Sequence, residues 1–124
     1  MIAVYHALQR RDWLALQHQV APVAVLRIGG RSRYAGIYQG MGQLIALAAQ
    51  LEERIIPFRS EIEELRLDGD GVRAIVKVFI RMPTRDVFEA RLRETFSFNG
   101  EGRISELVVR AEDQRALDEF LGSG

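Results

Sequence analysis

Apolar and polar residues alternate along two long segments near the end of the chain, which predicts two antiparallel strands within residues 87–111, hinged at residues 99–102. If Phe98 lies opposite Arg103, one face of this pair is apolar except for Glu94. That face carries Phe88, Ala90, Leu92, Glu94, Phe96 and Phe98, with Ser105, Leu107, Val109 and Ala111. The other face carries Glu89, Arg91, Arg93, Thr95, Ser97, Glu106 and Arg110, with Val87, Ile104 and Val108 interspersed. The pattern therefore predicts a buried face with a single acid and a hydrated face.

Earlier apolar segments predict three more strands. Alternation over residues 72–82 and the apolar positions of residues 60–67 predict two of them. The Asp-Gly-Asp-Gly sequence at residues 68–71 joins these two as a tight hairpin, because both glycines tolerate a positive φ. Residues 23–28 are a compact predicted strand.

Apolar residues at helical spacing predict four helices, three of them before the long strand pair and one after it. Asp12 and Asp113 stand where N-cap residues are expected, and Pro22 and Pro57 end the second and third helices. The four predicted helices cover about residues 2–10, 12–21, 42–54 and 113–121. Helices first and an antiparallel meander afterwards predict an α+β fold, with the helices on one face of a curved sheet.

The length of 124 residues suits one domain, so we expect a single domain over residues 1–121 and a flexible tail over residues 122–124. A composition of 48% hydrophobic and 27% charged residues is that of an ordinary globular protein. The 17 basic residues balance the 17 acidic ones, which argues against nucleic acid as a partner. No apolar run is long enough for a signal peptide or a membrane span, so we expect a soluble, cytoplasmic protein with no membrane partner.

The chain has no cysteine, which excludes disulfides, thiolate catalysis and the usual structural zinc sites. His6 and His18 lie on separate predicted helices without an acidic cluster nearby, so they give no metal-ligand pattern. Gly29-Gly30 does not lead into a helix with Lys-Ser or Lys-Thr, so a phosphate-binding loop is not indicated. We therefore expect neither a metal nor a cofactor.

Three short motifs give the chain a resemblance to a known family. They are Phe96-x-Phe98-Asn99-Gly100-x-Gly102-Arg103-Ile104, Ala7-Leu8-x-x-x-Asp12 and Ala35-Gly36-x-Tyr38-x-Gly40. From Tyr5 to Leu121 the sequence resembles the nuclear transport factor 2 superfamily, and within it the SnoaL-like branch. The resemblance implies a cone-shaped, cystatin-like α+β barrel, in which N-terminal helices pack on the concave face of a curved antiparallel sheet around a hydrophobic pocket. It also implies a homodimer formed through the outer sheet face.

The resemblance carries catalytic positions over one residue at a time. Glu94 falls where ketosteroid isomerases keep a protonated acid that donates to the substrate oxygen, with Glu in place of Asp. The general base of those isomerases falls at Arg27, and their tyrosine falls at Val4, next to Tyr5. The catalytic aspartate of SnoaL-type cyclases and epoxide hydrolases falls near Val109. Glu94 is therefore the acid that the resemblance carries over.

An isolated buried carboxylate costs several kcal/mol, so Glu94 must be paired, hydrogen-bonded or protonated. Burial would raise its pKa and make it a usable acid or base near neutral pH. Two structural alternatives stay open at this point. The twist of the strand can bring Glu94 to solvent, or an arginine such as Arg27 can pair with it for architecture alone.

Six further residues are candidate ligand contacts, namely Arg27, Tyr5, Tyr34, Tyr38, Phe96 and Val109. Arg27 suits an anionic group or Glu94 itself if it faces the cavity, whereas a slip of one residue in register places it outside. The tyrosines offer hydroxyl groups, and the resemblance implies that the segment with Tyr34 and Tyr38 lies at the mouth of the pocket.

The leading hypothesis is a SnoaL-like protein that binds a small apolar organic molecule in its pocket, with Glu94 as the acid. Catalysis there would be cofactor-free acid/base chemistry, an isomerisation, cyclisation, hydration, dehydration or hydrolysis. The alternative is a non-catalytic dimeric module of the same fold, with its cavity filled by its own side chains. In that case the outer sheet face, with Arg91, Arg93, Val108 and Arg110, serves dimerisation or the docking of a partner.

Overall fold

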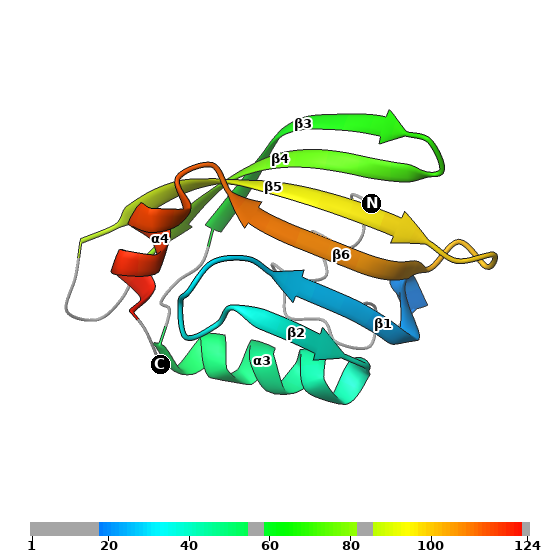
Figure 1. The fold of residues 1–124 in the computed structure, drawn as a ribbon, viewed down its shortest axis with the longest axis horizontal. Coiled ribbons are helices and arrows are strands. Elements are labelled where there is room, and N and C mark those ends of the chain that lie inside the picture. The colour runs from blue at the N-terminus through cyan, green and yellow to red at the C-terminus, as the bar shows by residue number, and fades with distance from the viewer. Residues whose placement is uncertain (1–17, 55–58, 82–85, 123–124) are drawn as a thin grey trace.

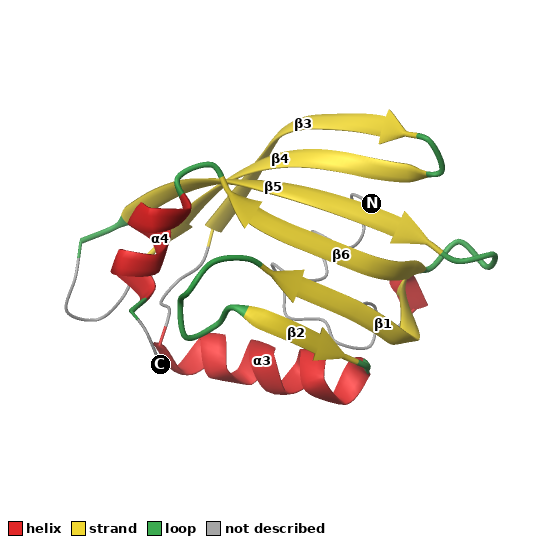
Figure 2. Ribbon diagram, viewed as in Figure 1, coloured by secondary structure: helices red, strands yellow, loops and turns green. Residues whose placement is uncertain are grey.

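A computed structural model of the chain describes residues 18–54, 59–81 and 86–122. In this part a six-stranded curved sheet is accompanied by two helices (Figures 1 and 2), which confirms the predicted α+β class. The elements in chain order are β1 (Val20–Ile28), β2 (Gly36–Gln39), α3 (Met41–Arg54), β3 (Arg59–Asp68), β4 (Gly71–Ile80), β5 (Phe88–Phe98), β6 (Ile104–Ala111) and α4 (Gln114–Leu121). The helix predicted for residues 2–10 lies outside the described residues. Of the helix predicted for residues 12–21, only the last residues are described.

The strands follow the order β2-β1-β6-β5-β4-β3. Strands β3 to β6 form the predicted antiparallel meander, and β1 runs antiparallel to β2. The pairing of β1 with β6 is parallel, which differs from the purely antiparallel sheet that the sequence predicted. Parallel neighbours need a long connection, and here the whole stretch from β2 to β5 lies between the two strands in sequence.

Strand β1 begins at Val20, three residues before the predicted start, although it contains Pro22. The register between β1 and β6 shifts between Val20 and Val25, so the proline lies within an irregular part of the ladder. Proline has no N–H to give to a ladder and is found in sheets at such irregularities. The helix predicted to end at Pro22 therefore ends earlier, and residues 18 and 19 are its described helical part.

The turn between β5 and β6 is longer than a two-residue hairpin. The Asn99 side-chain Oδ1 accepts hydrogen bonds from the backbone N–H groups of Glu101 at 2.9 Å and Arg103 at 3.0 Å. As a result Phe98 lies opposite Ile104 rather than Arg103, and the register shifts between Ser97 and Phe98. Ile104, predicted on the hydrated face, is therefore buried at 4% exposure.

The core lies on one face of the sheet, which we call the concave face. From β4 and β5 it takes Ala74, Val76, Val78, Ile80, Ala90 and Phe96. Helix α3 packs against β1 and β2 and buries Leu47, while α4 buries Leu117 and Leu121. The Phe120 ring of α4 stacks on Phe88 with centroids 4.7 Å apart. The apolar stripes predicted for both helices are thus the surfaces that close the core.

Helix α4 is also tied to the loop between β1 and β2 by polar groups. The predicted N-cap is confirmed, since Asp113 Oδ1 accepts from the Ala116 N–H at 3.1 Å. Asp118 accepts from the Arg31 N–H at 2.9 Å through Oδ2 and from Gln114 Nε2 at 3.0 Å through Oδ1. This network holds the C-terminal helix across the end of the sheet.

Candidate functional site

Glu94 lies near the middle of β5 and is half-buried. Its neighbours across the strands are Ala74 of β4 and Val109 of β6. Alternation along β5 places Leu92 and Phe96 on the same face. Each of these four neighbours of Glu94 on the sheet is apolar.

The apolar surface continues across the sheet toward β2. Leu26 and Ile28 of β1 lie beside Leu107 and Val109 of β6, and Tyr38 of β2 lies beside Leu26. Among the strand positions described on the concave face, Glu94 is the one with a charged side chain. A carboxyl group at the centre of such a surface can give a proton to, or take one from, an apolar molecule held against it.

Tyr38 shares this face, but the chain itself uses its hydroxyl proton. The Tyr38 hydroxyl donates to the Tyr34 backbone carbonyl at 2.7 Å. Burial raises the pKa of the Tyr38 phenol, so the hydroxyl stays protonated at neutral pH. Toward a ligand the Tyr38 oxygen can therefore act as an acceptor of hydrogen bonds.

The structure divides the other predicted ligand contacts into two groups. Phe96, 1% exposed, and Val109, half-buried, lie on the concave face with Glu94. Tyr34 is 4% exposed and belongs to the core, so it does not form an open rim of a pocket. Tyr5 lies outside the described residues.

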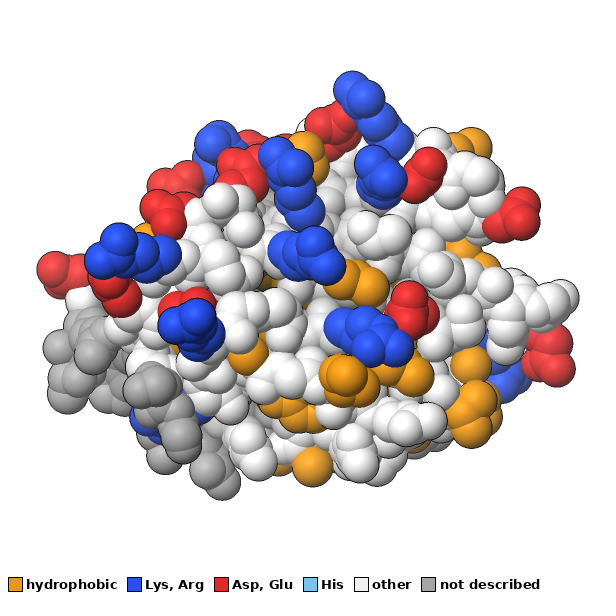
Figure 3. Space-filling view, viewed as in Figure 1, with side chains coloured by type: hydrophobic (Ala, Val, Ile, Leu, Met, Phe, Trp, Pro, Cys, Tyr) orange, Lys and Arg blue, Asp and Glu red, His pale blue; other side chains and the backbone are white. Residues whose placement is uncertain are grey.

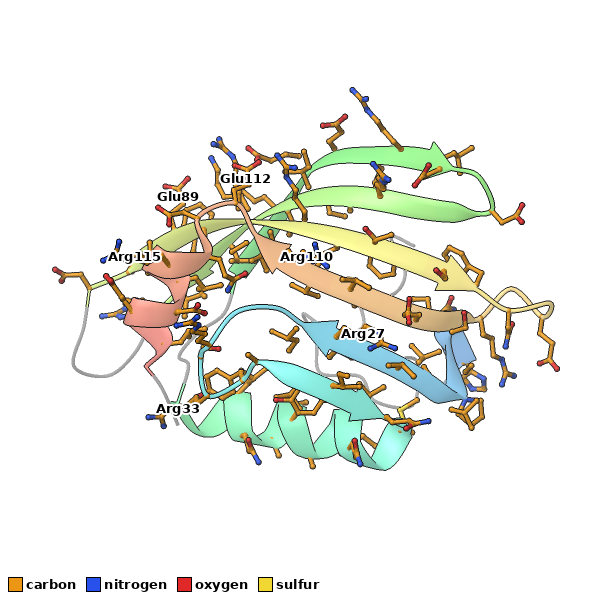
Figure 4. The ribbon with its side chains drawn as sticks, in the orientation of Figure 1. Arg27, Arg33, Glu89, Arg110, Glu112 and Arg115 are labelled. Carbon is orange, nitrogen blue, oxygen red and sulfur yellow. The ribbon has the colours of Figure 1, made fainter. Side chains whose placement is uncertain are left out.

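The structure decides between the two orientations that the sequence left open for Arg27. Leu26 and Ile28 take the concave positions of β1, so Arg27 points to the opposite, outer face. There its Nε lies 3.1 Å from Glu106 Oε2, with the two side chains 48% and 38% exposed (Figure 4). The alternative in which Arg27 pairs with Glu94 is excluded by this geometry, because the two side chains lie on opposite faces of the sheet.

The outer face carries a hollow that the sequence reasoning did not predict. It has a volume of about 610 Å³ and lies over β3 to β6. Arg66 and Arg73 line it together with Arg93 and Arg110. The signal for the first two was present in the sequence, because a tight turn at residues 68–71 sets Arg66 opposite Arg73. Another hollow, of about 330 Å³, lies between the beginning of β5 and α4.

Two further properties concern the described residues alone. Residues 18–54, 59–81 and 86–122 contain no group of three or more His, Asp or Glu side chains placed to hold a metal ion. Neither of the helices in these ranges has the length and apolar character that crossing a membrane requires.

No protein-family model matches the sequence, and no curated protein matches it. Solved structures match it over nearly its whole length. A nuclear transport factor 2-like protein of unknown function from Burkholderia pseudomallei is 15% identical, with a TM-score of 0.86 over 98% of this chain and 93% of its own. A protein from Shewanella denitrificans described as a SnoaL-like polyketide cyclase is 18% identical, with a TM-score of 0.77 over 96% and 93%. TerC, co-crystallised with polyporic acid, is 12% identical, with a TM-score of 0.85 over 97% and 92%.

TM-scores of 0.77 to 0.86 over nearly the whole chain show that these neighbours share its overall fold. Identities this low establish the shape of the chain and leave its chemistry to its own residues. The chain therefore has the nuclear transport factor 2-like fold, and one of its structural neighbours is described as a SnoaL-like polyketide cyclase.

Proposed function

We propose that the chain binds a small, mostly apolar organic molecule against the concave face of its sheet, with Glu94 as the acid that meets it. The observation that carries this proposal is that Glu94 is the one charged position among the described strand residues of an apolar face built from five strands. The structural neighbour TerC supports the proposal, because it was co-crystallised with an organic molecule, polyporic acid.

The chemistry that such a site can perform is proton transfer. Glu94 in its acid form would donate to an oxygen of the ligand, and in its ionised form it would take a proton from carbon or oxygen. Tyr38 would accept a hydrogen bond from a ligand hydroxyl, because its own proton is held by the Tyr34 carbonyl. An isomerisation, cyclisation, hydration, dehydration or hydrolysis without a cofactor fits these groups.

The test is binding of a neutral aromatic probe, 2-naphthol, followed by NMR chemical shifts as a function of pH. We expect the amide signals of β5 and β6 to shift, with an affinity that changes with pH in the wild type. Glu94→Gln keeps the shape of the side chain and should remove the pH dependence. Glu101→Gln, on the exposed turn after β5, is the matched control and should leave the binding curve unchanged.

A lack of any shift on the concave face would contradict the proposal. So would a pH-dependent affinity that persists in Glu94→Gln, because the titrating group would then lie elsewhere.

The second candidate is a non-catalytic dimeric module that pairs through its outer sheet face. It is favoured by the exposure of apolar side chains at the β1–β2 end of the sheet, where Ile37 is 63% and Val23 is 75% exposed. Ile37 lies beside Arg27 and so belongs to the outer face. Light scattering on Ile37→Lys tests this function, since a dimer that needs this surface would become a monomer.

A further inference from the structure

The outer-face hollow is bordered by two pairs of arginines that face each other across neighbouring strands. Arg66 of β3 lies directly opposite Arg73 of β4, and Arg93 of β5 lies directly opposite Arg110 of β6. Figure 3 shows Lys and Arg side chains gathered on this face, and Figure 4 labels Arg110 there. Like charges directly opposite each other destabilise an antiparallel pair. Without a bound anion, the two facing arginine pairs therefore lower the stability of the folded chain.

Carboxylates near the edge of the hollow neutralise part of the positive charge of Arg66 and Arg73. Arg66 contacts Glu64 of its own strand, which is the one acidic side chain on the outer face in the lining. Arg73 reaches Asp68 at 2.7 Å, outside the lining, with side chains 69% and 50% exposed. Pairs as exposed as these contribute little, because water and salt screen them.

The second arginine pair is offset less. The Arg93 guanidinium lies 3.7 Å from Glu112, and Arg110 makes no ion pair with any described residue. The β5–β6 side of the hollow thus keeps an excess of positive charge on planar groups that suit carboxylate or phosphate oxygens.

The floor between the two arginine pairs is not charged. Ile75 lies beside Arg93, and Val108 lies beside Thr95, whose hydroxyl is the neutral polar group of the lining. Glu94 is also in the lining of the hollow, although alternation along β5 turns its side chain toward the concave face. The hollow thus combines an apolar base, a hydroxyl group and a rim of guanidinium groups.

We propose that this hollow binds a small organic anion, with a carboxylate or phosphate group held by Arg93 and Arg110 and an apolar body resting on Ile75 and Val108. A volume of about 610 Å³ is within the range of small-molecule sites. This site is separate from the one proposed around Glu94, because the two lie on opposite faces of the sheet. It does not need that site to function.

The probe that tests it is 2-naphthoate, with the neutral 2-naphthamide as its uncharged partner. In an NMR titration at low salt, we expect naphthoate to shift the amide signals around Arg93, Thr95 and Val108, and naphthamide to bind at least about tenfold more weakly. Added salt should weaken naphthoate binding. The double variant Arg93→Gln/Arg110→Gln should lose about tenfold or more in affinity.

Two controls show whether naphthoate binding depends on the arginines of this hollow. Arg115→Gln removes an arginine of α4 that pairs with Glu119 outside the hollow, and it should leave the affinity unchanged. The double variant Arg93→Gln/Arg110→Gln should in turn leave the binding of 2-naphthol to the concave face unchanged, so that failure of the concave-face proposal and failure of this one are distinguishable. Without any ligand, Arg110→Gln should melt at the same or a higher temperature, because it removes one of two facing like charges.

Three results would overturn the proposal. One is equal binding of naphthoate and naphthamide, and another is full affinity in the double variant. The third is a dimer, detected by light scattering, that covers the hollow and excludes naphthoate from it.

Discussion

The hydroxyl group of Tyr38 makes a hydrogen bond within the chain itself. Tyr38 lies on the concave face among apolar residues, and its proton goes to the Tyr34 carbonyl in the loop between β1 and β2. The two residues are only four positions apart, so this hydrogen bond holds the backbone just before β2 in place. A buried polar group of this kind is stabilising only while its partner is present.

Replacing Tyr38 with Phe should lower the free energy of unfolding by about 1 kcal/mol, because the Tyr34 carbonyl loses its donor. The pKa of Tyr38 is raised by burial, so its contribution is present below the ordinary phenol pKa and is lost as pH rises through the raised value. Urea midpoints of the wild type and Tyr38→Phe should therefore converge in strong alkali. A difference between them that is independent of pH would contradict this prediction.

A glycine in the same loop allows the contact between loop and helix. Gly30 has a φ of 95°, and a Cβ there would lie 2.3 Å from Gln114 Nε2 and 2.4 Å from Asp118 Oδ1. We expect Gly30→Ala to cost at least about 2 kcal/mol, from backbone strain and displacement of that network. Gly100→Ala is the control, since a Cβ there meets nothing within 4 Å, and it should change stability little. Equal melting temperatures for Gly30→Ala and Gly100→Ala would contradict this prediction, because the loop would then accept a Cβ at Gly30 without loss of stability.

At the scale of elements, alternation and turn residues predicted most of the architecture. The strands β3, β4 and β5, the helix α3 and the cap of α4 were found close to their observed ends, because each carries a strong local signal. The features that the sequence did not predict are strand β2, the parallel pairing of β1 with β6, and the irregular ladder at Pro22 in β1 and at Ser105 in β6. A bulge adds one residue to one strand and shifts the alternation beyond it, so a strict period of two places Ile104 on the wrong face.

Ion pairs on the outer face join strands of the sheet, and the pair between Glu63 of β3 and Arg91 of β5, which spans β4, predicts a dependence on pH. The hydrogen bond from Arg91 at 2.8 Å holds the pKa of the Glu63 carboxyl below its ordinary value. Because the folded pKa is lowered, the stabilisation is present above the ordinary carboxyl pKa and is lost as pH falls through the lowered one. Glu63→Gln should therefore be less stable than the wild type at neutral pH and equal to it in acid.

Chemical unfolding at a series of pH values measures this difference. Glu119→Gln, which removes the partner of Arg115 on α4, is the comparison and should show a smaller effect, because its side chain is 70% exposed. If the difference in unfolding free energy between Glu63→Gln and the wild type grew as the pH fell, the prediction would be wrong.

Over the whole molecule, one sheet keeps two chemical surfaces apart. The concave face offers an apolar bed with the Glu94 carboxyl, and the outer face offers guanidinium groups around Ile75 and Val108. The first could be predicted from the sequence, since alternation places Glu94 among phenylalanines and leucines. The second depended on which residues lie opposite each other, and for Arg93 and Arg110 that register follows from a bulge. The sequence also left open which face of the sheet Arg27 occupies, because that depends on the register of β1, which shifts between Val20 and Val25.

The parallel pairing of β1 with β6 also sets the order in which the protein can assemble. Among the described strands, the pair of β1 and β2 joins the rest of the sheet only through β6. During synthesis the meander of β3 to β5 can form by local contacts, while β1 waits exposed until β6 has left the ribosome. A fragment that stops in the turn at residues 99–102 would therefore lack the strand that docks the N-terminal part, and it would expose the apolar side of β1 to other chains.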